Sequence, residues 1–177
     1  MWIKVIVGLV VILVLFLAYV STRESKFHYE RSGTINASAD KIFPYLSNFK
    51  LGGEWSPYEK KDVNMKRSFG GADGVVGSTM EFDGNNDVGA GKLEMLKIVP
   101  NELVQIQLTM TKPFYGQNLV EYKLAPDGAG TKFTWAMSGD GGFMTKLITL
   151  FIDCDKMVAG DFEVGIANLK SVVEGKP

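Results

Sequence analysis

The chain has 177 residues, of which 19 are Lys or Arg and 20 are Asp or Glu, so its net charge is −1. That balance gives no basic surface, and we expect no nucleic-acid partner. The single cysteine, Cys154, excludes an internal disulfide and a cysteine-rich metal site. The single histidine, His28, argues against zinc, haem and Ser-His-Asp chemistry. We therefore expect neither a metal nor a cofactor.

Residues 1–20 are predicted to be a transmembrane anchor. Residues 5–20 are uncharged, and Lys4 can extend its ammonium group to the membrane interface. As a helix, about 20 residues span roughly 30 Å, the thickness of the hydrocarbon core. A cleaved signal peptide is the alternative, although the residues after the apolar run lack a small-x-small cleavage site. The first interpretation gives a single-pass protein of the cell membrane, in contact with the lipid bilayer through residues 1–20.

The side of the membrane that holds the soluble part is left open. Lys4 precedes the apolar run, whereas Arg23, Lys26 and Arg31 follow it. A count of basic residues keeps the domain in the cytoplasm, but very short N-terminal tails often stay inside while the rest is exported.

After a polar linker at residues 21–26, residues 27–177 are predicted to form one domain. Residues 27–35 alternate as a first strand. Ser38 is a predicted helix start, because Asp40 follows in the first turn and apolar residues then recur at spacings of three and four. We expect two short helices here, the second ending before Pro57, since a proline disfavours helix at the residue that precedes it.

Six more strands are predicted, and turn residues separate them. The clearest strand has Val104, Ile106, Leu108 and Met110 alternating with polar residues. The short connections favour antiparallel pairing. The predicted strands cover residues 64–69, 77–83, 88–98, 103–112, 116–125 and 131–138.

From about residue 142 to Glu174 the apolar spacing becomes helical. The pattern predicts one helix of roughly 30 residues, about 45 Å long, which is large enough to cover one face of the sheet. The expected class is α+β: a seven-stranded curved antiparallel sheet around a long C-terminal helix, with two short helices after the first strand and one transmembrane helix in front.

Three segments resemble the START-like (SRPBCC) superfamily, in particular its polyketide cyclase/dehydrase-type proteins. They are INASADKIFPYLSNF at 35–49, WSPYE at 55–59, and MSGDGGFMTKLITLFIDCDKM followed by DFEVGIANLK between 137 and 170. The resemblance covers about residues 27–174. It implies a helix-grip fold with an apolar cavity between sheet and helix, but it implies no particular reaction, because this fold serves carriers, cyclases and hydrolases alike.

The WSPYE segment is predicted to close that cavity. Trp55 and Tyr58 combine large apolar rings with polar tips. Glu54 and Glu59 lie on either side of Pro57, so the spacing gives no reason for their carboxylates to converge as a catalytic pair. No catalytic residue is assigned.

The candidate cavity residues share an inward position on a predicted strand, on the long helix or in the WSPYE segment. An ordinary core would show the same alternation, so the two remain alternatives. The candidates are Trp55, Tyr58, Met80, Phe82, Val104, Ile106, Leu108, Met110, Tyr122, Trp135, Met137, Phe151, Cys154, Val158, Phe162 and Gly165.

Small residues on the long helix have two interpretations. Gly160 and Gly165 each cost roughly 1 kcal/mol of helix propensity relative to alanine. Either they allow close packing against the sheet, or they leave space for a ligand. Cys154 lies between two aspartates, which would raise the pKa of its thiol, so a small apolar role is favoured over a reactive one.

Three functions are consistent with the sequence. The first is membrane-anchored binding of a hydrophobic small molecule or lipid, as a carrier or sensor. The second is a cyclase/dehydrase-like or hydrolase-like enzyme that uses a cavity carboxylate with a shifted pKa. The third is a protein-interaction or stress-response module at the membrane with a vestigial cavity, which a cavity filled by the protein's own side chains would favour. The ligand and the oligomeric state are not encoded in any feature that we recognise.

Overall fold

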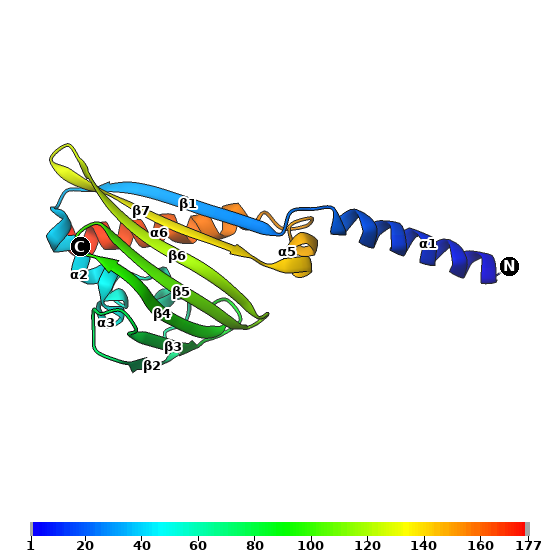
Figure 1. Ribbon diagram of the computed structural model, residues 1–177, viewed down its shortest axis with the longest axis horizontal. Coiled ribbons are helices and arrows are strands. Elements are labelled where there is room, and N and C mark those ends of the chain that lie inside the picture. The colour runs from blue at the N-terminus through cyan, green and yellow to red at the C-terminus, as the bar shows by residue number, and fades with distance from the viewer. Residues whose placement is uncertain (1, 176–177) are drawn as a thin grey trace.

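The computed structural model describes residues 2–175, so Met1 of the predicted anchor and residues 176–177 of the predicted domain lie outside the described residues. An N-terminal helix precedes one strand, three short helices, six strands and two further helices (Figure 1). The helices are α1 (Trp2–Ser21), α2 (Ala39–Ser47), α3 (Phe49–Gly52), α4 (Pro57–Lys61), α5 (Gly142–Ile148) and α6 (Cys154–Glu174). The strands are β1 (Lys26–Ile35), β2 (Lys66–Gly70), β3 (Thr79–Asp83), β4 (Ala90–Val99), β5 (Leu103–Lys112), β6 (Gly116–Asp127) and β7 (Gly130–Asp140).

The seven strands form one antiparallel sheet in the order β1-β7-β6-β5-β4-β3-β2. Strands β2 to β7 are a simple meander, and β1 pairs with β7 at the far edge. The register between β4 and β5 shifts twice, at Ala90/Gly91 and at Met95/Lys97. Such irregularities bend a strand and increase its twist, and the sheet curves around α6 (Figure 1). The predicted helix-grip fold is therefore confirmed, with strand boundaries within a few residues of those expected.

Helix α6 lies along the β1 and β7 side of the concave face. The Phe162 ring stacks on the Trp135 ring of β7, with centroids 4.4 Å apart and planes inclined by 12°. Phe162 and Leu169 are fully buried, as expected for the apolar stripe of a helix that covers a sheet. Gly175 ends the helix in the left-handed conformation, at φ 63°, which glycine adopts without steric cost.

The prediction of a single long C-terminal helix is wrong in one respect, because the helix is interrupted between α5 and α6. Residues 149–151 form a turn and residues 152–153 have no regular secondary structure. The Asp153 side chain accepts a hydrogen bond from the Lys156 backbone N–H at 3.0 Å. An aspartate cap of this kind starts a new helix. Apolar residues recur at helical spacing on both sides of this interruption, so the sequence pattern continues although the helix does not.

The two short helices expected after the first strand are in fact three. Helix α3 ends at Gly52, and Pro57 is the first residue of α4. A proline at this position needs no N–H partner and has a φ angle that suits a helix. The WSPYE segment therefore starts a helix as well as following one.

Helix α1 projects from the end of the domain at which α5 lies (Figure 1). By length and composition it could cross a membrane, and its residues up to Tyr19 are exposed. Its last turn is joined to the domain: Val20 is fully buried, and Lys146 Nζ of α5 donates a hydrogen bond to the Ser21 carbonyl at 2.8 Å. The polar connection to β1 is residues 22–25, slightly shorter than the predicted linker.

The two helix glycines provide a matched test of packing. A Cβ at Gly165 would lie 2.5 Å from Trp135 Cζ3 and 3.2 Å from Pro57 Cδ, whereas a Cβ at Gly160 meets nothing within 4 Å. We expect Gly165→Ala to lower the free energy of unfolding by about 1–3 kcal/mol through overpacking. Gly160→Ala should raise it by about 0.5–1 kcal/mol through helix propensity. Urea unfolding followed by Trp fluorescence measures both, and equal effects of the two substitutions would contradict the close packing at Gly165.

Candidate functional site

A cavity of about 310 Å³ lies between the concave face of the sheet and the helices that cover it. Helix α6 covers β1 and β7, while α2, α3 and α4 close the side near β3 to β5. Met157, at the start of α6, lines the cavity and is 58% exposed, and Asp87 in the β3–β4 turn lines it as well. The cavity therefore reaches the surface between these two elements.

One wall of the cavity is an aromatic cluster. The Trp55 ring lies 5.7 Å from Tyr122 and 5.3 Å from Trp135, in edge-to-face geometry in both cases. Two hydrogen bonds hold Trp55 in this position: its Nε1 donates to the Tyr45 carbonyl at 2.9 Å, and its own carbonyl accepts from Asn168 Nδ2 at 3.0 Å. The WSPYE segment thus contributes a fixed aromatic wall.

The opposite wall is aliphatic and rich in methionine. It comes from alternate residues of β3, β4 and β5, whose other residues face outward. Met80, Leu93, Leu108 and Met110 are only half-buried although they lie on the inner face. Flexible thioethers adapt to irregular apolar guests, so this wall is suited to ligands of varied shape.

Two tyrosine side chains place hydroxyl groups in this apolar environment. Tyr58 of α4 and Tyr122 of β6 both line the cavity, and burial raises the pKa of each phenol well above its ordinary value. Asp161 adds to the raised pKa of Tyr58, and Tyr58 adds to that of Tyr122. Both phenols are therefore protonated at neutral pH and can donate hydrogen bonds.

Two of the three carboxylates that line the cavity are paired, and the third, Asp87, is exposed in the β3–β4 turn. Glu59 Oε1 lies 2.7 Å from Arg67 Nη1, and an Asp161 carboxylate oxygen lies 2.7 Å from Lys61 Nζ. Glu54 is exposed and does not line the cavity, so the two glutamates of the WSPYE region do not share this site. Within residues 2–175, no cluster of three or more His, Cys, Asp or Glu side chains could hold a metal ion.

Most of the residues that the sequence nominated for the cavity do line it. They are Trp55, Tyr58, Met80, Phe82, Ile106, Leu108, Met110, Tyr122, Trp135, Met137, Val158 and Phe162. Their arrangement around one cavity follows from strand alternation together with the position of α6.

Four nominated residues lie elsewhere, each for a physical reason. Val104 is on the correct face of β5 but is fully buried in the core. Phe151 is 76% exposed because it lies in the break between α5 and α6. Cys154 begins α6 outside the lining, where burial and then Asp153 raise the pKa of its thiol. Gly165 packs against Trp135, which supports the close-packing interpretation of this glycine.

Several lining residues were not predicted from the sequence, and they lie on α2, α3, β4, β6 and α6 and in the segment between α4 and β2. Tyr45, Leu46, Phe49, Met65, Leu93, Val120 and Met157 belong to this group. Leu93 and Val120 follow the same strand alternation as the nominated residues and could have been found by it. The helix residues depend on how α2 and α3 sit over the sheet, which no local pattern encodes.

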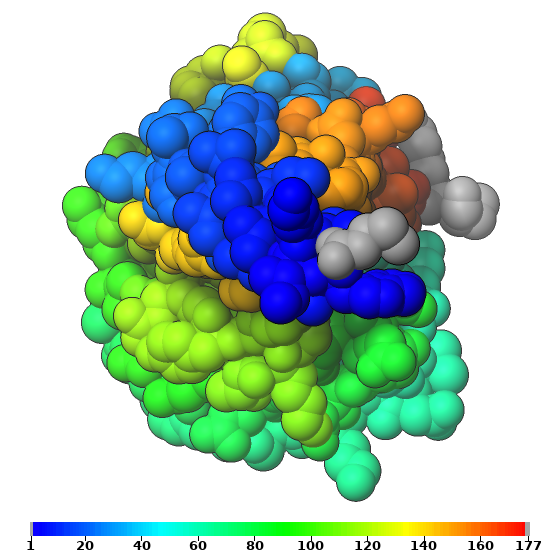
Figure 2. Space-filling model, turned by 90° about the vertical axis from the view of Figure 1, so that its right-hand side faces the viewer, coloured from blue at the N-terminus to red at the C-terminus, as the bar shows by residue number. Residues whose placement is uncertain are grey.

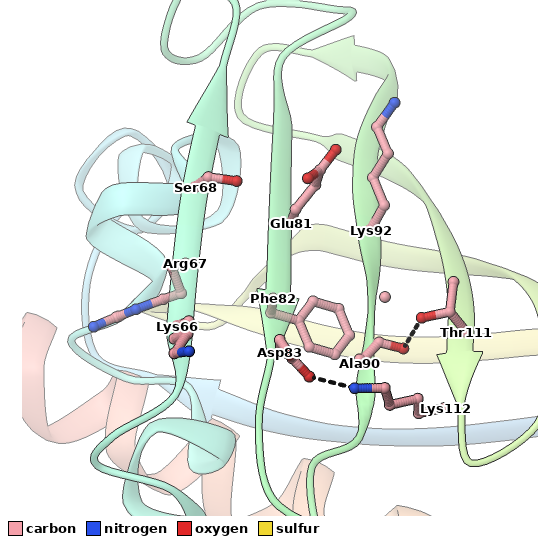
Figure 3. A pocket seen from close by; sticks show the side chains of 11 residues that line it. Lys66, Arg67, Ser68, Glu81, Phe82, Asp83, Ala90, Lys92, Thr111 and Lys112 are labelled. Atoms are coloured by element: carbon pink, nitrogen blue, oxygen red, sulfur yellow. Dashed lines mark hydrogen bonds and ion pairs between the residues drawn. The ribbon is translucent and has the colours of Figure 1, made fainter.

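A second, wider groove of about 490 Å³ lies on the outer face of β2 to β5 (Figure 3). One ion pair lies within the groove, with Lys112 Nζ 3.0 Å from Asp83 Oδ1, and Lys92 Nζ lies 3.1 Å from Oε2 of Glu94, which is outside the lining. Thr111 Oγ1 donates to the Ala90 carbonyl at 3.1 Å. This polar, open groove is a poor candidate for an apolar ligand.

A curved antiparallel sheet that grips a long helix around an apolar cavity defines the chain as a helix-grip protein. The chain belongs to the polyketide cyclase / dehydrase and lipid transport family, whose model matches residues 26–174. No match was found among curated proteins.

Solved structures share this fold at low sequence identity. The protein MLL2253 from Mesorhizobium loti is 16% identical, with a TM-score of 0.63 over 85% of this chain and 99% of that one. The Aha1 dimer from Colwellia psychrerythraea is 21% identical, with a TM-score of 0.61 over 85% and 98% of the two chains. Ara h 8.0201 is 13% identical, with a TM-score of 0.61 over 85% and 99%. These similarities establish the fold alone.

The buried tyrosines predict a pH dependence. A raised phenol pKa means that the folded state holds the proton more tightly than the unfolded state, whose phenols titrate near 10.0. The resulting stabilisation is complete below that pH and is lost as the pH rises through the folded pKa. We expect tyrosinate absorbance to rise in two phases in alkali, with the late phase accompanying unfolding. Tyr58→Phe combined with Tyr122→Phe should remove most of the late phase.

Proposed function

We propose that the protein is a membrane-anchored carrier or sensor that binds a hydrophobic small molecule or lipid in the internal cavity. The observation on which this rests is the apolar space of about 310 Å³ inside the domain. Ligand pockets typically measure about 300–1,000 Å³ and are lined by apolar and aromatic side chains with few polar groups. The cavity is at the lower end of that range, and its walls have this composition.

The space inside the domain distinguishes this proposal from a pure interaction module. In that alternative the protein's own side chains would fill the concave face. Here Trp55, Tyr122 and Trp135 form one rigid wall, yet half-buried side chains such as Leu108 and Met110 still border free volume. Protein interiors are otherwise close-packed, so a space of this size supports a role for it.

The ion pairs favour binding over catalysis. An acid or base that works in a dry cavity needs a carboxylate free to gain or lose a proton. Glu59 and Asp161 are instead held by Arg67 and Lys61 at 2.7 Å. The enzyme alternative would therefore have to use the tyrosines or Asp87, which is exposed at the mouth and not in a dry site, so binding is the better supported function.

Membrane anchoring is supported by α1 and by the surface around its base. Exposed apolar side chains gather there from the β5–β6 turn, from α5 and from the turn after α5. Figure 2 views this end of the molecule, with α1 in front of the β5–β6 region and beside α5. The exposed residues are Phe114, Tyr115, Phe143, Met144, Phe151 and Ile152. An exposed apolar surface next to an apolar helix is suited to contact with a bilayer.

Two substitutions on α6 test the binding function, one that fills the cavity and one that serves as its control. Val158 lines the cavity from α6, whereas Val164 on the same helix is exposed and does not line it. We expect native mass spectrometry of the gently extracted protein to show a bound lipophile, and Val158→Trp to reduce its occupancy about tenfold or more because the indole fills the space. Val164→Trp is the matched control and should retain it. A ligand-free wild-type protein, or equal occupancy in both variants, would contradict the proposal.

Two measurements on the protein in cell membranes test the anchor: its intact mass and its resistance to extraction. We expect the intact mass to include residues 1–20 and the protein to resist alkaline carbonate extraction. Replacing Leu9 and Leu13 by Arg should release it, because each arginine at the centre of a membrane helix costs about 3 kcal/mol. A mature chain that lacks the first 20 residues would instead identify a cleaved signal peptide.

A further inference from the structure

We infer that the cavity selects an uncharged apolar molecule with a hydrogen-bond acceptor, such as a ketone or ester carbonyl, at the end that meets Tyr58 and Tyr122. This inference rests on the proposed binding function and specifies its ligand class. Two features of the cavity lead to it: hydrogen-bond donors without partners, and the absence of a cationic group among the described lining residues.

The donors lie on two elements that face the same space. Tyr58 is on α4 and Tyr122 is on β6, and both line the cavity. In the described part of the chain, neither hydroxyl has a hydrogen-bond partner. Both residues are half-buried, and their hydroxyls are not among the fully buried unpaired polar atoms, so each keeps surface that a bound molecule can reach. A hydroxyl in an apolar cavity is normally satisfied by water or ligand. A ligand acceptor between the two hydroxyls would satisfy them.

A third donor lies in the same cluster. The Trp135 ring is 5.4 Å from the Tyr122 ring, and its Nε1 is buried without a hydrogen-bond partner among residues 2–175. The neighbouring Trp55 differs, because its Nε1 is bound to the Tyr45 carbonyl. The Trp135 indole can only donate and each tyrosine hydroxyl can donate as well as accept, so all three unpaired groups can serve an acceptor on the ligand.

The charges of the wall exclude an anionic head group. Among the described lining residues the charged side chains are Glu59, Asp87 and Asp161, and none is Lys or Arg. Arg67 and Lys61 are not part of that lining, and each already pairs with a carboxylate. A carboxylate or phosphate bound here would be buried without a counter-ion, at a large desolvation cost. A neutral carbonyl accepts the same hydrogen bonds without that cost.

The test compares ligands of one chain length on the full-length protein in phosphatidylcholine nanodiscs, with empty nanodiscs as the background. The ligands are 2-undecanone, undecane, undecanoate and undecyltrimethylammonium. We expect the ketone to bind about tenfold more tightly than the hydrocarbon, and undecanoate to bind no better than the hydrocarbon. Tightest binding of undecanoate or of the ammonium compound would overturn the inference, the latter by indicating a cation held by the aromatic rings.

Substitutions then assign the donors. Tyr58→Phe and Tyr122→Phe should each lower ketone affinity about three- to tenfold while leaving the affinity for undecane unchanged. Tyr115→Phe is the control, because Tyr115 is 72% exposed and does not line the cavity. Equal losses for ketone and hydrocarbon would show a packing effect and refute the assignment. Equal wild-type affinity for both would refute this inference but not the binding function, whereas no binding of any of the four ligands would count against both.

Discussion

The contact between Trp135 and Phe162 sets the distance between α6 and the sheet, and the rest of the domain depends on it. The rings lie nearly parallel with centroids 4.4 Å apart, one on β7 and one on α6. Three residues after Phe162, Gly165 presents bare backbone to the edge of the same indole. A larger residue at that position would push the helix away from the sheet. Because the interior is close-packed, such a shift would be transmitted along the whole helix.

This close approach on one side explains why the other side is hollow. Helix α6 lies over β1 and β7, whereas the inner residues of β3, β4 and β5 face the cavity and the short helices. A single helix cannot cover a curved seven-stranded sheet completely. Helices α2 to α4 close the remainder, and Asn168 of α6 fixes the WSPYE segment through the Trp55 carbonyl. The same helix therefore holds the aromatic wall in place and leaves space in front of the aliphatic one.

The strands and their inward faces were predictable because alternation is a local property: Ile106, Leu108 and Met110 face inward as their spacing requires. The same pattern could not separate the lined cavity from the closed core, and Val104, two residues earlier on the same face, is fully buried. The interruption of the helix before Asp153 could not be predicted, because apolar residues continue at helical spacing on both sides of it. Gly165 was ambiguous since its role depends on Trp135, a contact between residues 30 positions apart.

The connection between α1 and β1 limits what a membrane-anchored form of this protein could do. Residues 22–25 span at most about 14 Å when fully extended, and in the structure Lys146 already binds the carbonyl of Ser21. With α1 in a bilayer, as we propose, the domain would remain at the surface of that membrane, with its exposed apolar residues beside the lipid. Transport over a distance would need a longer connection. The geometry is better suited to exchange of a ligand with the same membrane, or to sensing its presence there.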